Sequence, residues 1–299
     1  MNNSSNLSAR IINGDVRSAL SVLEPESVQT CITSPPYWGL RDYGSENQIG
    51  QESTPEEYVE NIVKVFREVR RVLAKDGTIW VNLGDSYVGT GHKGDSHDPK
   101  NPAGRNGQKI ALNNKVAGMK SKDMVGIPWM VAFALRADGW YLRSDIVWHK
   151  PNQQPSPVKD RPVSSHEFIF LLSKSKIYSY DYEAVQVPTN DRKRKRRLRD
   201  VWSINTKPYP EAHFAVYPKE LILPCILAGS QKGETILDPF SGSGTTGVAA
   251  VEEGRNYVGV ESNPEYAQLS IDRLTKELNT ATVISLEIPP VEAPNILPE

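Results

Sequence analysis

Short apolar runs alternate with amphipathic stretches along most of this chain, which predicts strands that alternate with helices. The strongest helix signal begins at Thr54, which can cap a helix and which Glu57 completes as a capping box. Apolar residues then recur at helical spacing, at Tyr58, Ile62, Val65, Phe66, Val69, Val72 and Leu73. Strand-like apolar runs at 28–33 and 78–83 flank this helix, whose predicted end is Asp76-Gly77. This order predicts a βαβ unit and therefore a mainly parallel sheet.

The same alternation extends on both sides of the βαβ unit. Before it, the pattern predicts a strand over 9–12 and a helix over 16–23. After it come a helix over 127–137 and two strands over 141–148 and 167–172, which we expect to pair antiparallel at one edge of the sheet. The last third predicts a helix over 218–228, a strand over 235–237, a helix from near Thr245, and a strand that ends at Glu261 before a final helix. We expect an α/β fold with a mostly parallel central sheet and an antiparallel edge hairpin.

Three segments interrupt this alternation. We expect one domain over 1–285, with an insertion over 86–125 and a short basic segment over 188–211, followed by a loose, proline-rich tail over 286–299. The insertion is rich in Gly, Asn and Lys and is too long for a routine connection. It is either disordered without a partner or a mobile loop that closes on a ligand.

The composition is that of a soluble globular protein. The chain has 299 residues, of which 38% are hydrophobic, and its mean hydropathy is -0.47. It has no run of 18 apolar residues, and the opening "MNNSSNLSAR" lacks the apolar centre of a signal peptide. Cys31 and Cys225 lie in apolar contexts and are expected to be buried thiols rather than a disulfide. We therefore expect a cytoplasmic protein without a metal site.

The charge is unevenly distributed. The formal net charge is -1, but "RKRKRRLR" at 192–199 places seven basic residues in eight. Such a tract is either a solvated loop or a clamp for the phosphates of a polyanion. The candidate phosphate-contacting residues are Arg192, Lys193, Arg194, Lys195, Arg196 and Arg197.

A glycine-rich loop, "DPFSGSGTT", follows the predicted strand at 235–237. A turn of this kind between a strand and a helix is where α/β sheets bind nucleotide-like cofactors. Glu261 lies 23 positions after Asp238, at the end of the next strand, where an acid can hold two ribose hydroxyls. The candidate cofactor-binding residues here are Asp238, Phe240, Ser241, Gly242, Ser243, Gly244, Thr245 and Glu261.

The sequence of this loop limits the choice of cofactor. It is not a P-loop, because no Gly-Lys-Ser/Thr follows, and it lacks the GxGxxG pattern. Asp238 at the strand end would repel a pyrophosphate but suits a cationic amino group. S-adenosylmethionine has an ammonium group and a ribose but no phosphate, so we predict it as the cofactor.

The second candidate site is the turn "TSPPY" at 33–37. Pro36 fixes its own φ and biases Pro35 toward an extended shape. The Ser34 hydroxyl and the Pro35 carbonyl offer acceptors at the end of a strand, with the ring of Tyr37 beside them. This arrangement suits a planar ligand that carries an amino group. Alone the turn would be a simple loop, but beside a methyl-donor site Ser34, Pro35, Pro36 and Tyr37 become the candidate catalytic residues.

"TSPPYWGLRDYG" with a downstream "DPFSGSGTT" resembles the restriction–modification DNA methyltransferases that act on exocyclic amino groups. The catalytic turn comes first and the cofactor loop last, as in the permuted β-class of that family. The resemblance covers 9–275 and implies the Rossmann-like fold of S-adenosylmethionine-dependent methyltransferases. It implies double-stranded DNA as the substrate and a cognate restriction endonuclease as a candidate partner. The family usually has a larger target-recognition region than the short basic segment over 188–211, so either the insertion over 86–125 shares the task as a mobile DNA-facing loop or recognition is short and weak.

The resemblance also assigns roles to individual residues. It places Asp15 near the cofactor adenine, Phe214 and Pro218 at the methionine pocket, and Glu261 at the ribose. For Trp148, His149 and Lys150 two alternatives stay open, a strand end or a place beside the extruded base.

The same resemblance bears on the target base. Tyr37 would stack on that base, while Ser34 and the Pro35 carbonyl accept its amino hydrogens. The serine form of this turn is commoner among enzymes that make N4-methylcytosine, so cytosine is favoured over adenine N6. Two rival hypotheses are a methyltransferase that acts on RNA or a small molecule, and a non-catalytic DNA-binding regulator.

Overall fold

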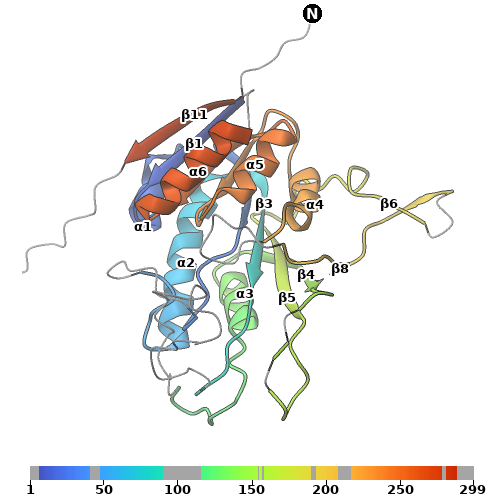
Figure 1. Cartoon of the computed structure of the whole chain (residues 1–299). Helices are drawn as coiled ribbons and strands as arrows, with labels where there is room; N and C mark the ends of the chain where they lie inside the picture. The colour runs from blue at the N-terminus through green and yellow to red at the C-terminus, as the bar shows by residue number, and fades with distance from the viewer. Residues whose placement is uncertain are drawn as a thin grey trace, which may run out of the picture.

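The computed structural model of the chain describes residues 7–40, 48–89, 116–153, 155, 156, 158–189, 193–207, 217–277 and 281–287. Its centre is a nine-stranded sheet in the order β11-β1-β10-β9-β2-β3-β5-β4-β8 (Figure 1). The strands of this sheet are β1 (Leu7–Asn13), β2 (Val28–Thr33), β3 (Leu73–Leu83), β4 (Tyr141–His149), β5 (His166–Ser173), β8 (Val201–Ser203), β9 (Thr235–Asp238), β10 (Asn256–Glu261) and β11 (Ala281–Glu287). A separate two-stranded ribbon pairs β6 (Val187–Pro188) with β7 (Lys195–Arg196).

Helices pack on both faces of the sheet. The helices are α1 (Val16–Ala19), α2 (Pro55–Val72), α3 (Ile127–Ala137), α4 (Lys219–Gly229), α5 (Thr245–Glu252) and α6 (Pro264–Glu277). Buried side chains of α1, α2 and α3 share one hydrophobic core, and those of α4, α5 and α6 share the other. Strand residues alternate between the two cores, as Cys31 and Ile32 do in β2. None of the helices in the described part of the chain is long and apolar enough to cross a membrane.

The predicted βαβ unit is confirmed, with one change at the end of its helix. β2 and β3 pair in parallel, and Thr54 and Glu57 form the predicted capping box at the start of α2. The helix ends at Val72 rather than at Asp76-Gly77, because Leu73 already has extended backbone angles and pairs with Val28. Leu73 therefore belongs to β3, although its spacing fits the apolar face of α2.

The two edges of the sheet differ from the prediction. β4 and β5 pair antiparallel as expected, but β8 pairs in parallel with β4 and takes the edge. At the other edge β11 pairs in parallel with β1, so Leu286 and Glu287 belong to a strand rather than to a loose tail. Both edge strands were missed because they are short or largely exposed and their alternation of apolar and polar residues is weak.

The helix predicted over 16–23 is also wrong in part, since α1 ends at Ala19 and continues as a 3-10 turn over Leu20–Val22.

The two ends of the predicted insertion are joined at its base. A bridge pairs Tyr87 with Met124, and the Val88 amide donates to the Asp123 carbonyl at 2.9 Å. The Asp85 carboxylate accepts from the first amides of α3, those of Gly126 (2.9 Å) and Ile127 (3.0 Å). Residues 90–115 lie outside the described residues, so the choice between disorder and a mobile loop stays a prediction.

Gly247 sets the distance between α5 and the sheet. A Cβ at this position would lie 2.6 Å from two ring carbons of Tyr257, whose side chain is fully buried on β10. The ring cannot withdraw without opening the core that α5 shares with α4 and α6.

We predict that Gly247→Ala lowers the free energy of unfolding by about 1–3 kcal/mol, the usual cost of overpacking a core. Alanine alone would stabilise a helix interior by about 1 kcal/mol, so the sign of the change reports which effect wins. Denaturant unfolding of the variant beside the wild-type protein measures it. A gain in stability would contradict the contact between Gly247 and Tyr257.

Candidate active site

The two predicted sites come together at the carboxyl ends of neighbouring parallel strands. The turn at 33–37 leaves β2 and the glycine loop leaves β9, and these strands pair through Thr30 with Ile236 and Cys31 with Leu237. β10, which ends at Glu261, lies on the other side of β9. The carboxyl edge of a parallel sheet is where α/β proteins bind their ligands.

A buried carboxylate ties the two sites to each other. Asp238 accepts hydrogen bonds from the Thr33 hydroxyl at 2.6 Å and the Phe240 amide at 3.1 Å on one oxygen. Its other oxygen accepts from the hydroxyls of Thr246 (2.5 Å) and Tyr217 (3.2 Å). Burial raises the pKa of Asp238, while these four hydrogen bonds oppose the rise. Both oxygens are thus engaged by protein donors, and Asp238 is not among the residues that line the pocket described next.

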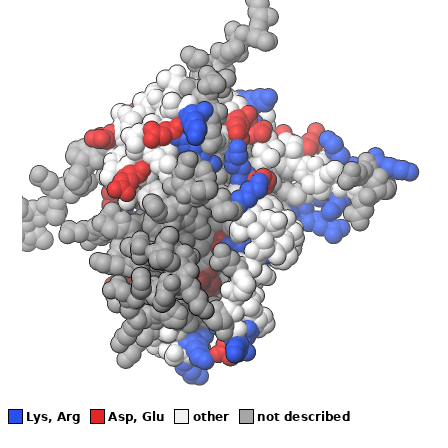
Figure 2. Space-filling view, in the orientation of Figure 1, with Lys and Arg blue, Asp and Glu red and all other residues white. Residues whose placement is uncertain are grey.

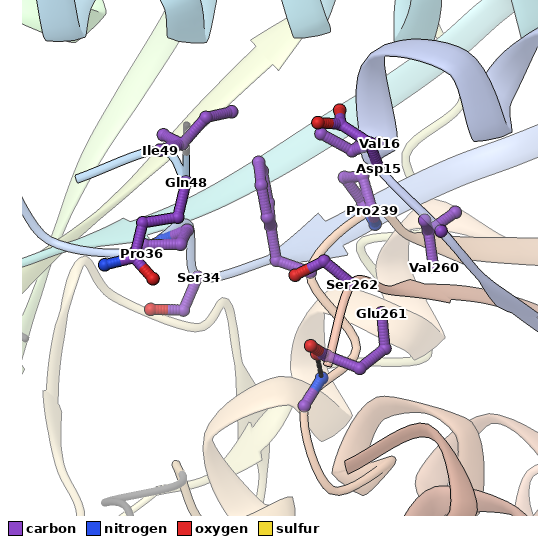
Figure 3. Close-up of a pocket in the computed structure, with 13 residues that line it drawn as sticks. Asp15, Val16, Ser34, Pro36, Gln48, Ile49, Pro239, Val260, Glu261 and Ser262 are labelled. Atoms are coloured by element: carbon purple, nitrogen blue, oxygen red, sulfur yellow. Dashed lines mark hydrogen bonds between the residues drawn. The ribbon is translucent and has the colours of Figure 1, made fainter. Parts of the chain in front are cut away.

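A pocket opens between the turn and the glycine loop (Figure 3). Six of its lining residues were predicted from the sequence, namely Asp15, Ser34, Pro36, Phe240, Gly242 and Glu261. The others are Gly14, Val16, Gln48, Ile49, Pro239, Val260 and Ser262. Gln48 and Ile49 carried no sequence signal, because they reach the pocket only through the fold. Two lining residues are acids, Asp15 and Glu261, and no lining residue in the described part of the chain is Lys or Arg, so the lining is acidic.

Glu261 stands at the edge of this pocket with its carboxylate held by main-chain donors. It accepts from the Gly242 amide at 2.9 Å, the dashed line in Figure 3, and from the Asn263 amide at 2.8 Å. Burial raises the pKa of Glu261 to about 7, which the hydrogen bonds to main-chain amides only partly offset. Its charge therefore changes near neutral pH.

Asp15 lines the same pocket and follows Gly14, whose amide donates to the Glu261 carbonyl at 3.0 Å. Its carboxylate caps α1 by accepting from the Arg17 amide at 2.8 Å, and it also pairs with the Arg17 guanidinium. Burial alone would raise the pKa of Asp15, but the hydrogen bonds and charge of Arg17 lower it. Asp15 is therefore an ionised acceptor with a fixed orientation.

The remaining loop residues shape the loop instead of lining the pocket. Gly244 has a φ of 78° and precedes α5, where a Cβ would meet the Ser270 hydroxyl at 2.3 Å. The Ser241 hydroxyl lies 2.9 Å from that of Tyr257. Arg273 donates to the Thr245 hydroxyl at 2.9 Å, and its contact to the Ser243 carbonyl is 3.3 Å.

The two candidate residues before the loop differ in what can be said of them. Pro218 lies at the start of α4, whereas Phe214 lies outside the described residues.

The turn after β2 is held firmly by the elements around it. The Pro36 carbonyl accepts from the Tyr58 hydroxyl of α2 at 2.9 Å, and Pro35 is buried. Trp38, for which the sequence suggested no role, is buried in the core and donates to the Glu52 carbonyl at 2.9 Å. Ser34 remains partly accessible and lines the pocket.

The hydroxyl of Tyr37 enters a polar cluster that sequence reasoning missed. It donates to Glu167 at 2.9 Å and lies 3.2 Å from the Asn82 side-chain oxygen. Burial raises the pKa of Tyr37 well above its usual value, and the charge of Glu167 adds to the rise. Lys150 forms an ion pair with Glu167, which places Lys150 beside the site. Trp148, by contrast, is buried within β4.

The basic tract lies on a ribbon that projects from the body of the protein (Figure 1). Val187 pairs with Arg196 and Pro188 with Lys195, which forms the β6–β7 ribbon. Lys and Arg side chains crowd this projection (Figure 2), and Arg197 lies over the ring of Tyr182 at 5.1 Å. Arg192 lies outside the described residues.

Comparison with known proteins gives consistent relatives. The DNA methylase family that acts on N6 and N4 amino groups matches residues 28–272. The type II methyltransferase M.SmaI of Serratia marcescens is 50% identical over 90% of this chain and 91% of its own length. M.Cfr9I of Citrobacter freundii, also a type II methyltransferase, is 52% identical over 90% of this chain and 88% of its own length.

Solved structures agree with these relatives. A Thermus thermophilus protein, TTHA0409, assigned as a DNA modification methylase and solved with S-adenosylmethionine, has a TM-score of 0.64 at 26% identity. The match covers 93% of this chain and 99% of that one. The cytosine-N4-specific PvuII DNA methyltransferase shares the fold, with a TM-score of 0.67 at 20% identity over 93% of this chain and 96% of its own. The predicted Rossmann-like methyltransferase fold is therefore confirmed, and the chain belongs to the DNA methylase family of N6- and N4-directed amino-methyltransferases.

Proposed function

We propose that this protein transfers a methyl group from S-adenosylmethionine to the N4 amino group of a cytosine extruded from double-stranded DNA. The observation that carries the proposal is the hydrogen bond between Thr33 and Asp238, at 2.6 Å. It fixes a turn with amino-group acceptors against a loop that borders the pocket. The non-catalytic regulator is disfavoured, because Ser34 of the turn and Glu261 beside the glycine loop line one pocket.

The pocket residues fit S-adenosylmethionine by their chemistry. The Glu261 carboxylate suits the two ribose hydroxyls, and the acidic Asp15 lies on the adenine side assigned by the family resemblance. The absence of Lys and Arg among the described lining residues, with two carboxylates present, favours a cationic ligand without phosphates. When bound, the cofactor supplies an electrophilic methyl group on a sulfonium. We infer that Asp238 contributes indirectly, by holding the loop and the turn.

The turn would present the amino group to that methyl. Ser34 and the Pro35 carbonyl would accept hydrogen bonds from its two N–H groups, which turns the nitrogen lone pair out of conjugation with the base. The nitrogen would then gain the methyl, with release of the cofactor as a neutral thioether, and lose one of its two protons. The Tyr37 ring stacks on the base and fixes its plane. Because these groups act by positioning, most of the rate gain comes from alignment of the attacking nitrogen. Base extrusion is required, since the amino group is otherwise paired within the duplex.

Cytosine is the preferred target because the turn carries Ser34 in place of an aspartate. We further propose that the basic tract contacts the DNA backbone, since phosphate contacts position a protein without specifying sequence. A cognate restriction endonuclease is proposed as a partner, because the related M.SmaI and M.Cfr9I are type II methyltransferases. A reducing, cytoplasmic location fits the free, buried thiols of Cys31 and Cys225.

We predict that DNA incubated with the protein and labelled cofactor, then digested to nucleosides, yields N4-methylcytosine. Label in N6-methyladenine would contradict the base assignment but keep the mechanism, whereas label in RNA alone would contradict DNA as the substrate. Ser34→Ala should lower the turnover rate by about 100- to 1000-fold, the range for loss of one positioned polar group. Lys64→Gln, on the exposed face of α2, serves as the control and should keep full activity.

We predict that cofactor affinity falls as the pH drops through about 7, where Glu261 takes up a proton. The ionised carboxylate accepts two ribose hydrogen bonds, so the protonated form binds more weakly. Below the pKa the dissociation constant should rise by up to about tenfold per pH unit. Calorimetric titration between pH 6 and 8 measures it. In Glu261→Gln the affinity should be lower at every pH and independent of pH, and an unchanged pH dependence in this variant would contradict the role of Glu261.

We predict that Arg194→Gln with Lys195→Gln weakens DNA binding with little effect on sequence preference. Each lost phosphate contact should reduce the slope of log K against log salt by about 0.9. The dissociation constants for two duplexes of equal length, one with and one without the site that the protein methylates, are measured at several salt concentrations. They give the salt slope and the sequence preference. A larger loss on the specific duplex than on the other would show that the tract reads bases, which the proposal excludes.

A further inference from the structure

An ion pair sits beside the turn with little access to water. Lys150 and Glu167 contact each other with side-chain exposures of only 13% and 17%. Glu167 lies near the start of β5 and pairs with Trp148, so the ion pair lies at the end of the β4–β5 hairpin where the connection between the two strands begins. The Lys150 ammonium also lies 4.2 Å from the centre of the Trp148 ring. These contacts fix the lysine from two sides.

The carboxylate of Glu167 is shared between the ion pair and the turn. One oxygen faces Lys150, while the other accepts from the Tyr37 hydroxyl at 2.9 Å and the Asn82 amide at 3.2 Å. Asn82 in turn donates to the Phe168 carbonyl at 3.1 Å, so its side chain is anchored to the main chain of β5. Glu167 is therefore held by Asn82 of β3 and by Lys150 after the end of β4, and one of its oxygens accepts a hydrogen bond from the Tyr37 hydroxyl.

The ring of Tyr37 is held at its edge as well as at its hydroxyl. A Cβ on Gly84 would lie 2.6 Å from the Tyr37 Cε2 atom, so the ring rests directly on the main chain after β3. The Ser34 hydroxyl lies 3.5 Å from the Tyr37 hydroxyl. The ring thus has a main-chain support at one edge and an anchored hydroxyl at its tip, next to the group assigned to the base amino hydrogens.

A buried ion pair of this kind is a weak source of stability, because desolvation of the two charges offsets their attraction. The hydrogen bonds that Glu167 accepts from Tyr37 and Asn82 point instead to the orientation of a neighbouring side chain. We infer that Glu167, braced by Lys150 and Asn82, is a positioning residue that sets the plane of the Tyr37 ring and hence of the extruded base. The inference rests on the proposed function, because it takes the Tyr37 ring as the platform for that base. A shift of about 1 Å in a reacting group can cost about 100-fold in rate, so a tilted platform would act on the methyl-transfer step.

A double-mutant cycle with Tyr37→Phe tests this inference. The Phe ring keeps the stacking surface but loses the hydroxyl that Glu167 holds. We expect Glu167→Ala to slow single-turnover methyl transfer by about 10- to 100-fold in the wild-type background and by less than about threefold in the Tyr37→Phe background. The dissociation constant for S-adenosylmethionine, measured in parallel, should change little. Glu167→Ala leaves the Lys150 ammonium buried without its partner, so the rates are compared at a temperature below the thermal midpoint of every variant. Equal losses in both backgrounds would overturn the inference, because Glu167 would then act independently of Tyr37.

A conservative pair of variants separates orientation from charge. Glu167→Gln keeps an oxygen acceptor for Tyr37 but leaves the Lys150 ammonium buried without its partner. Adding Lys150→Met removes that ammonium, so the double variant should recover most of the rate that Glu167→Gln loses. Failure of this rescue in a folded double variant would contradict a positioning role through the Tyr37 hydroxyl.

A spectroscopic measurement tests the hydrogen bond between Tyr37 and Glu167 without any substrate. With tyrosine labelled by ¹³C at Cζ, the Tyr37 resonance is the one absent from the Tyr37→Phe spectrum. We expect Glu167→Ala to shift this resonance and leave that of Tyr257, far from Glu167 on β10, in place. An unshifted Tyr37 resonance would overturn the inference even if the protein methylates no DNA. If the resonance shifts but Tyr37→Ala keeps full methyl transfer, the proposed role of the ring fails instead.

Discussion

The hydrogen bond from Thr33 to Asp238 connects the two halves of the active site. The partners are 205 positions apart, and the contact is buried and short at 2.6 Å. Each residue is the last of a strand, so the contact also aligns the carboxyl ends of β2 and β9. Because the Asp238 carboxylate holds Thr246 and Tyr217 as well, the turn, the start of α5 and the entry to α4 share one anchor. Losing it would leave a buried carboxylate short of donors, which is costly.

Sequence reasoning reached the fold wherever a strong local pattern coincided with burial. The capping box of α2, the apolar run of β2 and the glycine loop all formed as predicted, because each is specified within a few residues. β8 and β11 were not predicted from the sequence. An exposed edge strand needs apolar residues on one face at most, so its sequence pattern is weak. The role of Leu73 was misjudged for a related reason, since an apolar residue at helical spacing can equally begin a buried strand.

For the candidate site too, residues in local motifs were predicted and residues brought together by strand pairing were missed. Ser34, Phe240 and Glu261 were found because their motifs are contiguous in sequence, and they line the pocket. Glu167 and Asn82 were missed because their meeting with Tyr37 depends on antiparallel register between β3 and β5, which no local signal fixes. Asp238 shows the opposite limit. Its motif was recognised, but only the three-dimensional contacts reveal that both of its oxygens accept hydrogen bonds from protein donors.

The electrostatics of the site follow from how each acid is solvated. Asp238 is surrounded by four protein donors, Asp15 faces an arginine, and Glu261 has main-chain amides but no cation among its described partners. Of the three, Glu261 is the acid whose pKa rises to about 7, and the charge of Asp238 contributes to that rise. A cationic ligand entering this pocket would lower the pKa of Glu261 and release a proton, so binding and ionisation reinforce each other. Binding of a cation thus favours the ionised form of Glu261, and the ionised form favours binding of a cation. This coupling, in a described lining without lysine or arginine, favours a positively charged cofactor.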